Sequence, residues 1–292
     1  MSLSVNSGCP WRSRTQSRGL RYGLFDSAPS RGYHDHMSNN PPPTPTSAHI
    51  LGVRVDDVTL DEALSWAERA IQSGAPRQVA TVNVEFVMAA RGDGEFRRVL
   101  AGSALCVPDS AGIMWAARTL GRPLRERIPG VEMAQGLAAL AAQRGYGLYL
   151  LGAAPGVAEQ AAAKLREAHP ALRIAGTYAG SPAAAEEAEI VARIRQAAPQ
   201  ILLVAYGAPK QELWISRNMH RLGVPVLMGV GGTLDYLAGV VKRAPAAWRR
   251  LGLEWLYRLY RQPWRWRRML SLPHFAWRVL VARLGRAEEE RC

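Results

Sequence analysis

The sequence predicts an α/β protein with a Rossmann-like, mostly parallel sheet that is covered by helices on both faces. Strand-like apolar runs alternate with helical patterns over residues 48–241. One run, Ile201–Ala205, has the length and unbroken apolar character of a buried parallel strand. It breaks at Tyr206-Gly207, and Pro209 then marks the start of a helix whose first turn is Lys210–Glu212. This helix would begin at the carboxyl edge of the sheet, where open α/β sheets bind their ligands.

Turn and capping signals define the elements of the N-terminal half. Thr59 and Glu62 form a capping box that opens the first predicted helix, and Gly74 marks its end. Around this helix, apolar runs predict strands and a 3.6-residue periodicity predicts helices. The other elements expected here are a strand over Ile50–Val55, a strand over Gln78–Asn83, a helix with a glycine interruption over Glu85–Leu100, and a strand over Ala104–Val107.

The same signals continue through the C-terminal half of the alternating region. Gly152 and Gly156 form a tight turn into a helix that ends near Ala168. The strand Ile201–Ala205 and a strand at residue 225 complete the series. The remaining elements are a helix over Val131–Gln143, a strand over Gly147–Leu151, a strand over Leu172–Ala175 and a helix over Ala183–Ala197.

Composition divides the chain into three parts. Residues 1–47 are rich in Ser, Arg, Asn and Pro and contain no apolar run that could form a core or a secretory signal, so we expect a disordered N-terminal extension. Residues 48–241 are expected to form the α/β core, and residues 242–292 a basic helical appendage. The best candidate for a membrane span, 224–241, contains an aspartate and four glycines, which argues against a transmembrane helix.

The net charge of +13 and the sequence pI of about 10.4 predict an anionic partner, such as a membrane surface, a nucleic acid or a phosphorylated ligand. Most of this charge lies in the appendage, where residues 242–286 contain twelve Lys and Arg residues and one acid, a local charge of +11. The three cysteines, Cys9, Cys106 and Cys292, lie far apart and lack the spacing of metal ligands. They suit a reducing cytoplasm and argue against a disulfide scaffold or a zinc site.

The appendage also carries an apolar helical stripe. Trp248, Leu251, Trp255 and Leu259 recur at spacings of three and four, and most neighbouring arginines fall off this stripe. Part of the stripe is expected to pack on the sheet domain. Tryptophan beside arginine is also typical of the headgroup level of an anionic membrane. We therefore expect a cytoplasmic protein that attaches peripherally to the inner face of the cell membrane.

Polar or glycine-rich runs follow the carboxyl ends of five predicted strands. Turns favour Asn, Asp, Gly and Pro in any protein, so a single run is weak evidence of a site. Five runs at one edge of one sheet would form a pocket of an acid, amides and glycine backbone, which suits a nucleotide. The runs are Thr81–Glu85, Pro108–Gly112, Gly176–Gly180, Gly207–Glu212 and Gly229–Asp235.

These residues belong to a pattern that continues into the appendage. The pattern is Thr81-x-Asn83, Pro108-Asp109, Arg127-x-x-Gly130, Gly207-Ala-Pro-Lys-Gln211-Glu212, Gly231-Gly232 with Asp235, Arg243-Ala244-Pro245 and Glu254-Trp255-x-x-Arg258-Leu259. With it, the chain resembles the WecG/TagA/CpsF glycosyltransferases of bacterial cell-surface polysaccharide synthesis from about residue 50 to residue 269. Ser110, Pro129 and Glu132 depart from the family pattern, which has Gly, Thr and Asp there.

The resemblance implies transfer of a sugar, typically N-acetylmannosamine, from a UDP-sugar to a polyprenyl-diphosphate-linked N-acetylglucosaminyl lipid, with inversion at the anomeric carbon. Inversion needs a base for the acceptor hydroxyl, and Asp109 at a strand end is the best-placed carboxylate. The same aspartate could instead cap the helix that follows it. Arg127 is expected to stabilise the departing diphosphate, with an ordinary surface arginine as the alternative.

The remaining matched residues are expected to bind the substrates. Thr81, Asn83 and Gln211 would hydrogen-bond the donor, although each could instead cap local backbone. Asp235 would bind the ribose hydroxyls. The other expected contacts are Tyr178 and Gly180 along the base, Gly207, Pro209, Gly231 and Gly232 in the pocket wall, and Arg243 and Arg258 of the appendage at the diphosphate.

Neither a metal nor another cofactor is expected. The sequence has Asp56-Asp57 as an adjacent pair but no Asp-x-Asp at a strand end, and its six histidines are scattered. Three other functions stay open from the sequence: a glucosyltransferase of exopolysaccharide assembly on the same fold, a nucleotide sensor without a working base, and a nucleic-acid-binding module. The last lacks a recognised nucleic-acid motif, so no nucleic-acid partner is expected. A homo-oligomer is also compatible with the sequence.

Overall fold

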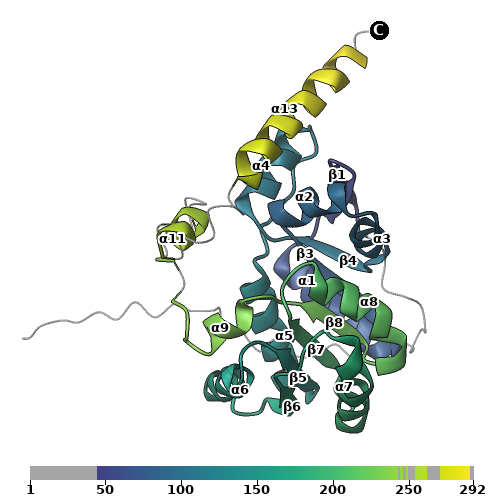
Figure 1. The fold of residues 1–292 in the computed structure, drawn as a ribbon, viewed down its shortest axis with the longest axis vertical. Coiled ribbons are helices and arrows are strands. Elements are labelled where there is room, and N and C mark those ends of the chain that lie inside the picture. The colour runs from purple at the N-terminus through teal and green to yellow at the C-terminus, as the bar shows by residue number, and fades with distance from the viewer. Residues whose placement is uncertain (1–44, 243, 246–247, 249–253, 262–269, 290–292) are drawn as a thin grey trace, which may run out of the picture. The chain divides into compact units, whose positions relative to one another are not determined.

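The computed structural model describes residues 45–242, 244–245, 248, 254–261 and 270–289, and at positions 254, 258, 261 and 286–289 it describes only the backbone. Figure 1 shows how the elements are arranged. The N-terminal extension predicted over residues 1–47 lies outside the described part up to residue 44, so the prediction of disorder there stays a prediction.

Six parallel strands form the main sheet, as the alternation of strands and helices predicts. In sheet order the strands are β4 (Leu105–Pro108), β3 (Arg77–Val82), β8 (Val226–Gly229), β7 (Ile201–Ala205), β5 (Gly147–Gly152) and β6 (Arg173–Tyr178). All except β6 are buried along nearly their whole length, because helices cover both faces of the sheet. The edge strand β6 is half-exposed and runs three residues past its predicted end.

The prediction of a single strand over Ile50–Val55 is wrong. The structure has two antiparallel strands there, β1 (Ser47–Ile50) and β2 (Val53–Asp56), which pair as a separate two-stranded sheet. Leu51 and Gly52 connect them with φ values of 49° and 88°, and two successive left-handed residues make a tight hairpin turn. The strand β1 begins at Ser47, one residue before the boundary predicted for the α/β core at residue 48.

Among the described residues, four helices cover one face of the sheet. The first, α1 (Leu60–Ser73), begins with the predicted capping box. The Thr59 hydroxyl accepts the Glu62 N–H at 3.2 Å, and the Glu62 carboxylate accepts the Thr59 N–H at 3.0 Å. Gly74, with a φ of 69°, ends the helix. The other helices on this face are α5 (Gly130–Arg144), α6 (Val157–Ala168) and α9 (Thr233–Leu237).

Two groups of helices cover the opposite face. The group over β5, β7 and β8 is α7 (Ala184–Ala197) and α8 (Lys210–Leu222), and Figure 1 shows α6 and α7 on opposite sides of β5 and β6.

The single helix predicted over residues 85–100 is in fact two, because the Asp93 carboxylate accepts the Phe96 N–H at 2.9 Å and starts a second helix. The group over β3 and β4 is α2 (Val84–Gly92), α3 (Gly94–Gly102) and α4 (Ala111–Thr119), beside the hairpin.

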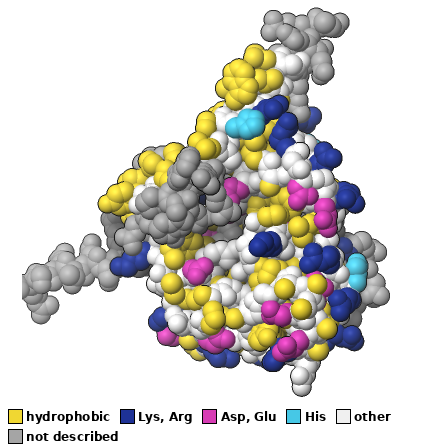
Figure 2. All heavy atoms as spheres, viewed as in Figure 1, with side chains coloured by type: hydrophobic (Ala, Val, Ile, Leu, Met, Phe, Trp, Pro, Cys, Tyr) yellow, Lys and Arg dark blue, Asp and Glu magenta, His cyan; other side chains and the backbone are white. Residues whose placement is uncertain are grey.

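Two further helices of the predicted appendage are described, α11 (Glu254–Arg261) and α13 (Ser271–Glu289). Phe275 and Val279 of α13 are buried in the same cluster as α2 and α4, so this helix packs on the core. Of the predicted apolar stripe, Leu251 lies outside the described residues. Figure 2 shows hydrophobic side chains over α13, next to basic and histidine side chains. In the described part of the chain, every helix is too short or too polar to cross a membrane.

Candidate active site

A cavity of about 500 Å³ lies at the carboxyl edge of the sheet, where the loops after β3, β4, β7 and β8 meet. These four strands are neighbours in the sheet, so loops that are far apart in the sequence converge on one place. Trp255 of α11, with Ser271 and Leu272 of α13, completes the described lining from the C-terminal part of the chain. A cavity of this size at this edge can hold a nucleotide-sized ligand.

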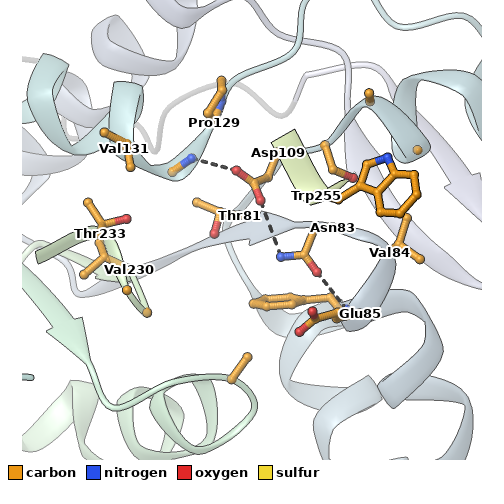
Figure 3. A pocket seen from close by; sticks show the side chains of 18 of the residues that line it. Thr81, Asn83, Val84, Glu85, Asp109, Pro129, Val131, Val230, Thr233 and Trp255 are labelled. Atoms are coloured by element: carbon orange, nitrogen blue, oxygen red, sulfur yellow. Dashed lines mark hydrogen bonds between the residues drawn. The ribbon is translucent and has the colours of Figure 1, made fainter. Parts of the chain in front are cut away.

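Asp109 follows β4, and its carboxylate is held at two points on the cavity wall (Figure 3). Its Oδ1 accepts the backbone N–H of Gly130 at 2.7 Å, and its Oδ2 accepts the side-chain amide N–H of Asn83 at 3.4 Å. Asn83 follows β3, and its own Oδ1 caps α2 by accepting the Phe86 N–H at 3.0 Å. The carboxylate is therefore oriented by groups from two other parts of the chain.

Asp109 is not the N-cap residue of the helix that follows it, which is the alternative role that the sequence leaves open. Ser110 is the N-cap of α4, and its side chain makes no capping bond. The Asp109 carboxylate lies instead at the N-terminus of α5, where free N–H groups and the helix dipole favour a negative charge. An oriented carboxylate on a cavity wall is the arrangement that a general base requires.

Two threonines flank the N-terminus of α5 next to Asp109 (Figure 3). Thr81 lies at the end of β3 and is 7% exposed, and Thr233 begins α9. A Cβ atom placed on Gly130 would lie 3.6 Å from the Thr81 hydroxyl oxygen and 3.8 Å from the Thr233 hydroxyl oxygen. Both distances are those of ordinary van der Waals contact, so both threonine side chains lie against the helix end.

Gln211 connects two of the loops that line the cavity. Its Oε1 accepts the backbone N–H of Gly207 at 3.0 Å and the backbone N–H of Gly231 at 2.9 Å. Its Nε2 donates to the Glu212 carboxyl at 2.7 Å, and the Gln211 side chain is 2% exposed. The described contacts make Gln211 a residue that positions the β7–α8 and β8–α9 loops, in addition to lining the cavity.

Glu212 is buried directly behind this bridge. Burial raises the pKa of its carboxyl to about 7. One oxygen accepts from Gln211, and the other finds no hydrogen-bond partner among the described residues. A Cβ atom on Gly229, the last residue of β8, would lie 2.4 Å from the Glu212 carboxyl and 2.6 Å from the Gln211 amide nitrogen. Only glycine at this position leaves room for the buried pair.

Arg127 lines the cavity from the loop between α4 and α5. Contacts on both sides hold this loop. Ile128 donates its N–H to the Pro108 carbonyl at 2.7 Å, and the Arg125 guanidinium donates to both oxygens of Glu62 at 2.6 and 2.8 Å. The Arg127 side chain is half-buried, and the ion pairs found within the described residues do not involve it. Its guanidinium is available to an anionic ligand.

The cavity brings together eight of the residues that the sequence assigns to the site. Pro209 lines an adjoining hollow instead. Arg243 lies outside the described residues, and Arg258 is described only by its backbone, within α11. The eight residues are Asp109, Arg127, Thr81, Asn83, Gly207, Gln211, Gly231 and Gly232.

Tyr178, Gly180 and Asp235 are not among the described residues that line the cavity. Tyr178 ends the edge strand β6, which β5 and β7 separate from β8. Its ring lies 4.7 Å below the Arg193 guanidinium, and Gly180 packs against the same ring. Asp235 lies in α9 behind Gly232, where burial raises the pKa of its carboxyl. For Tyr178 and Gly180, the order of the strands keeps the loop after β6 away from the four loops that line the cavity.

Sequence reasoning missed several residues of the cavity. Trp115 of α4, Glu85 of α2 and Thr233 of α9 line it. Glu85 and Thr233 occur in the polar runs after strands, so their position was a usable signal. Trp115 is 40% exposed in the largely apolar helix α4. The sequence does not show which side of this helix faces the cavity, because that depends on how the helix packs.

The polar groups of the cavity are mainly hydrogen-bond donors. Asp109 and Glu85 are the acids among its described lining residues. Within the described part of the chain, no three His, Cys, Asp or Glu side chains gather as a metal site. The lining offers instead the threonine hydroxyls, the Arg127 guanidinium and the backbone of Gly232, which suit phosphate and sugar oxygens, while the N–H groups of Gly207 and Gly231 already donate to Gln211.

Comparisons with known proteins agree with this geometry. The family model described as "Glycosyl transferase WecG/TagA/CpsF family" matches residues 48–289. A Bacillus subtilis (strain 168) N-acetylglucosaminyldiphosphoundecaprenol N-acetyl-beta-D-mannosaminyltransferase is 36% identical over 203 residues, which are 69% of this chain and 78% of the relative. A Staphylococcus aureus (strain MW2) protein of the same name is 32% identical over 236 residues, 80% of this chain and 92% of the relative. The chain is a glycosyltransferase and belongs to the WecG/TagA/CpsF family.

Proposed function

We propose that this glycosyltransferase moves an N-acetylmannosaminyl group from a UDP-activated donor to the N-acetylglucosamine of a polyprenyl diphosphate, with inversion. The names of the relatives from Bacillus subtilis and Staphylococcus aureus specify this sugar, a β linkage and an undecaprenyl-diphosphate acceptor. From an α-linked nucleotide sugar, a β linkage arises by one displacement. The observation that carries the proposal is the Asp109 carboxylate, which the Gly130 N–H holds on the cavity wall at 2.7 Å.

One displacement needs one base. The acceptor hydroxyl oxygen attacks the anomeric carbon, the bond from this carbon to the diphosphate oxygen breaks, and its electron pair leaves with UDP. Asp109 takes the proton of the attacking hydroxyl. The Gly130 N–H and the Asn83 amide keep the carboxylate oriented, so that little reorganisation is needed during the reaction.

The leaving diphosphate needs positive charge and hydrogen-bond donors as the bond breaks. Arg127 supplies a half-buried guanidinium at the cavity, and the Gly231-Gly232 loop lines the same cavity with its backbone. Gln211 fixes the Gly231 backbone by its bond to the N–H. We assign Arg243 and Arg258 of the C-terminal segment to the same diphosphate, since Trp255 of α11 already reaches the cavity. With these cations, the transfer proceeds without a divalent metal.

The acceptor is anchored in a membrane, which the enzyme must reach from the cytoplasmic side. The outer face of α13 carries Trp277, 65% exposed, and Leu284, 67% exposed, with Arg278 and Arg283 also exposed. Aromatic and apolar groups beside cations suit the headgroup region of an anionic bilayer. This face of α13 supports peripheral attachment next to the acceptor.

The test is a reaction of the purified full-length chain with UDP-N-acetylmannosamine and N-acetylglucosaminyl diphosphopolyprenol in detergent. We expect release of UDP and a lipid product heavier by one N-acetylhexosamine. UDP-N-acetylglucosamine and UDP-glucose serve as donor controls. Transfer from UDP-glucose alone would favour the glucosyltransferase alternative, and binding of UDP without turnover of any donor would favour a nucleotide sensor.

A further inference from the structure

A second hollow of about 280 Å³ adjoins the cavity on the side of α2 and α3. Glu85, Phe86, Ala208 and Ser271 line both spaces, so the two lie next to each other. Because Glu85, Phe86, Met88 and Ala89 of α2 make up half of its described lining, we call it the α2 groove. Its remaining described lining consists of Phe96 and Pro209.

The α2 groove is apolar in contrast to the main cavity. The rings of Phe86 and Phe96 form its floor, with centroids 5.4 Å apart in an edge-to-face arrangement, and they are 3% and 0% exposed. Met88 is half-buried, and Ala89 is exposed at the rim. Among the described residues that line the groove, Glu85 alone carries a charge, and it stands at the junction with the main cavity.

The other end of the junction is the start of α13. Ser271 is the first residue of this helix and lines both spaces. The positive end of the helix dipole therefore lies at the junction, which favours a phosphate group there and offsets the charge of Glu85. Further along, α13 exposes the apolar side chains that we assign to the membrane surface, including Trp277 and Leu284.

We propose that the α2 groove binds the first isoprene units of the acceptor lipid. This inference rests on the proposed function. A sugar diphosphate lipid has its parts in a fixed order of sugar, diphosphate and hydrocarbon. The protein has matching surfaces in the same order: the polar wall around Asp109, the junction at Ser271, and the apolar groove over Phe86 and Phe96. The groove gives the enzyme a way to bind the lipid, and not only its sugar.

The proposal is tested with two acceptors on the full-length chain in detergent. One is N-acetylglucosaminyl diphosphopolyprenol, and the other carries an ethyl group in place of the polyprenyl chain. Because each buried methylene contributes to affinity, we expect the wild-type KM to be about tenfold or more lower for the prenyl acceptor. Equal KM values for the two acceptors, with transfer to both, would overturn the groove but leave the proposed function intact. Failure to transfer to either acceptor would overturn both.

Substitutions in the groove separate lipid binding from catalysis. Ala89→Trp fills the exposed rim, and we expect it to raise the KM for the prenyl acceptor about tenfold while kcat/KM for the ethyl acceptor stays unchanged. Ala101→Trp is the matched control, because Ala101 is an exposed alanine of the neighbouring helix α3 that does not line the groove. Equal behaviour of the two variants, or equal loss on both acceptors, would argue against the proposal.

A labelling experiment gives a readout that does not depend on turnover. A prenyl acceptor with a photoreactive group on its second isoprene unit is irradiated with the wild-type chain, and the labelled peptide is identified by mass spectrometry. We expect the label on residues 84–96, with competition by unlabelled prenyl acceptor and not by the ethyl acceptor. Label confined to other parts of the chain would overturn the assignment. Met88→Gln replaces Ala89→Trp if that variant does not fold. It keeps the size of a half-buried side chain but makes it polar, so we expect it to weaken labelling.

Discussion

The Asp109 carboxylate accepts the backbone N–H of Gly130 at 2.7 Å, which ties the end of β4 to the first residue of α5. The bond orients the carboxylate and places it at the positive end of a helix, although 21 residues separate the two partners. The bond orients the candidate base before any substrate binds. Replacement of the Asp109 carboxylate is therefore the most direct test of the site.

We expect Asp109→Asn to lower kcat by about 10²–10⁴ while UDP binding persists, because the amide has nearly the same shape but cannot accept the acceptor proton. Turnover is followed by UDP release and binding by calorimetry. Asp61→Asn, at an exposed acid of α1, is the control. Near wild-type turnover of the Asp109 variant would remove this residue from the role of base.

We expect Gln211→Leu to weaken both folding and donor binding. The substitution leaves the N–H groups of Gly207 and Gly231 without their acceptor, which costs about 1–3 kcal/mol for each group that water cannot reach. Urea denaturation should show the lower unfolding free energy, and kinetics should show a higher KM for the donor. Gln160→Leu, at an exposed position of α6, is the control. An unchanged unfolding free energy would contradict the bridging role.

Glu212 should make stability depend on pH in a defined window. Burial raises the pKa of its carboxyl from 4.5 to about 7, so between these values the folded chain keeps a proton that the unfolded chain loses. The unfolding free energy should therefore fall as pH rises through this window, by about 3 kcal/mol in total, and level off above it.

Glu212→Gln cannot ionise and keeps an oxygen for the Gln211 amide, so its unfolding free energy should lack this decrease. Urea denaturation of both proteins between pH 4.5 and 8 measures the difference. Glu95→Gln, at an exposed acid of α3, should keep the wild-type slope. Parallel curves for wild type and Glu212→Gln would show that this carboxyl is not the source of the dependence.

Activity should persist in excess chelator, because arginine and backbone groups are proposed to stabilise the departing diphosphate. The measurement is the rate of UDP release with and without EDTA on protein that was dialysed against the chelator. Complete loss that magnesium restores would show that a metal acts at the diphosphate.

The outer face of α13 should carry membrane binding. We expect the double substitution Trp277→Ser and Leu284→Ser to abolish sedimentation with anionic liposomes at moderate salt and to leave the unfolding free energy unchanged, because both side chains are mostly exposed. Val240→Ser, at a 58% exposed surface position of the α/β domain, is the control. Point substitutions are preferable to removal of the helix, since Phe275 and Val279 on its inner face belong to the core cluster. Undiminished sedimentation of the double variant would contradict the assignment.

The elements themselves could be predicted because their signals are local. The capping box of Thr59 and Glu62, the strand Ile201–Ala205 and the helix after Pro209 each depend on residues within a few positions of one another. The errors have the same origin. The single strand predicted over Ile50–Val55 is wrong because a two-residue turn at Leu51-Gly52 hardly interrupts an apolar run. The glycine interruption predicted within one helix is instead the boundary between two helices.

The sequence by itself determined the α/β class and the approximate bounds of most elements, because periodicity is a local signal. It also determined eight residues of the cavity lining, seven from the polar runs after strands and Arg127 from the family pattern. Only the tertiary structure decided which loops meet. The strand order places β4, β3, β8 and β7 side by side and leaves Tyr178 at the outer edge. It also decided that Asp109 bonds to Gly130 and that Gln211 joins two loops, since contacts between distant segments depend on the order and packing of the strands.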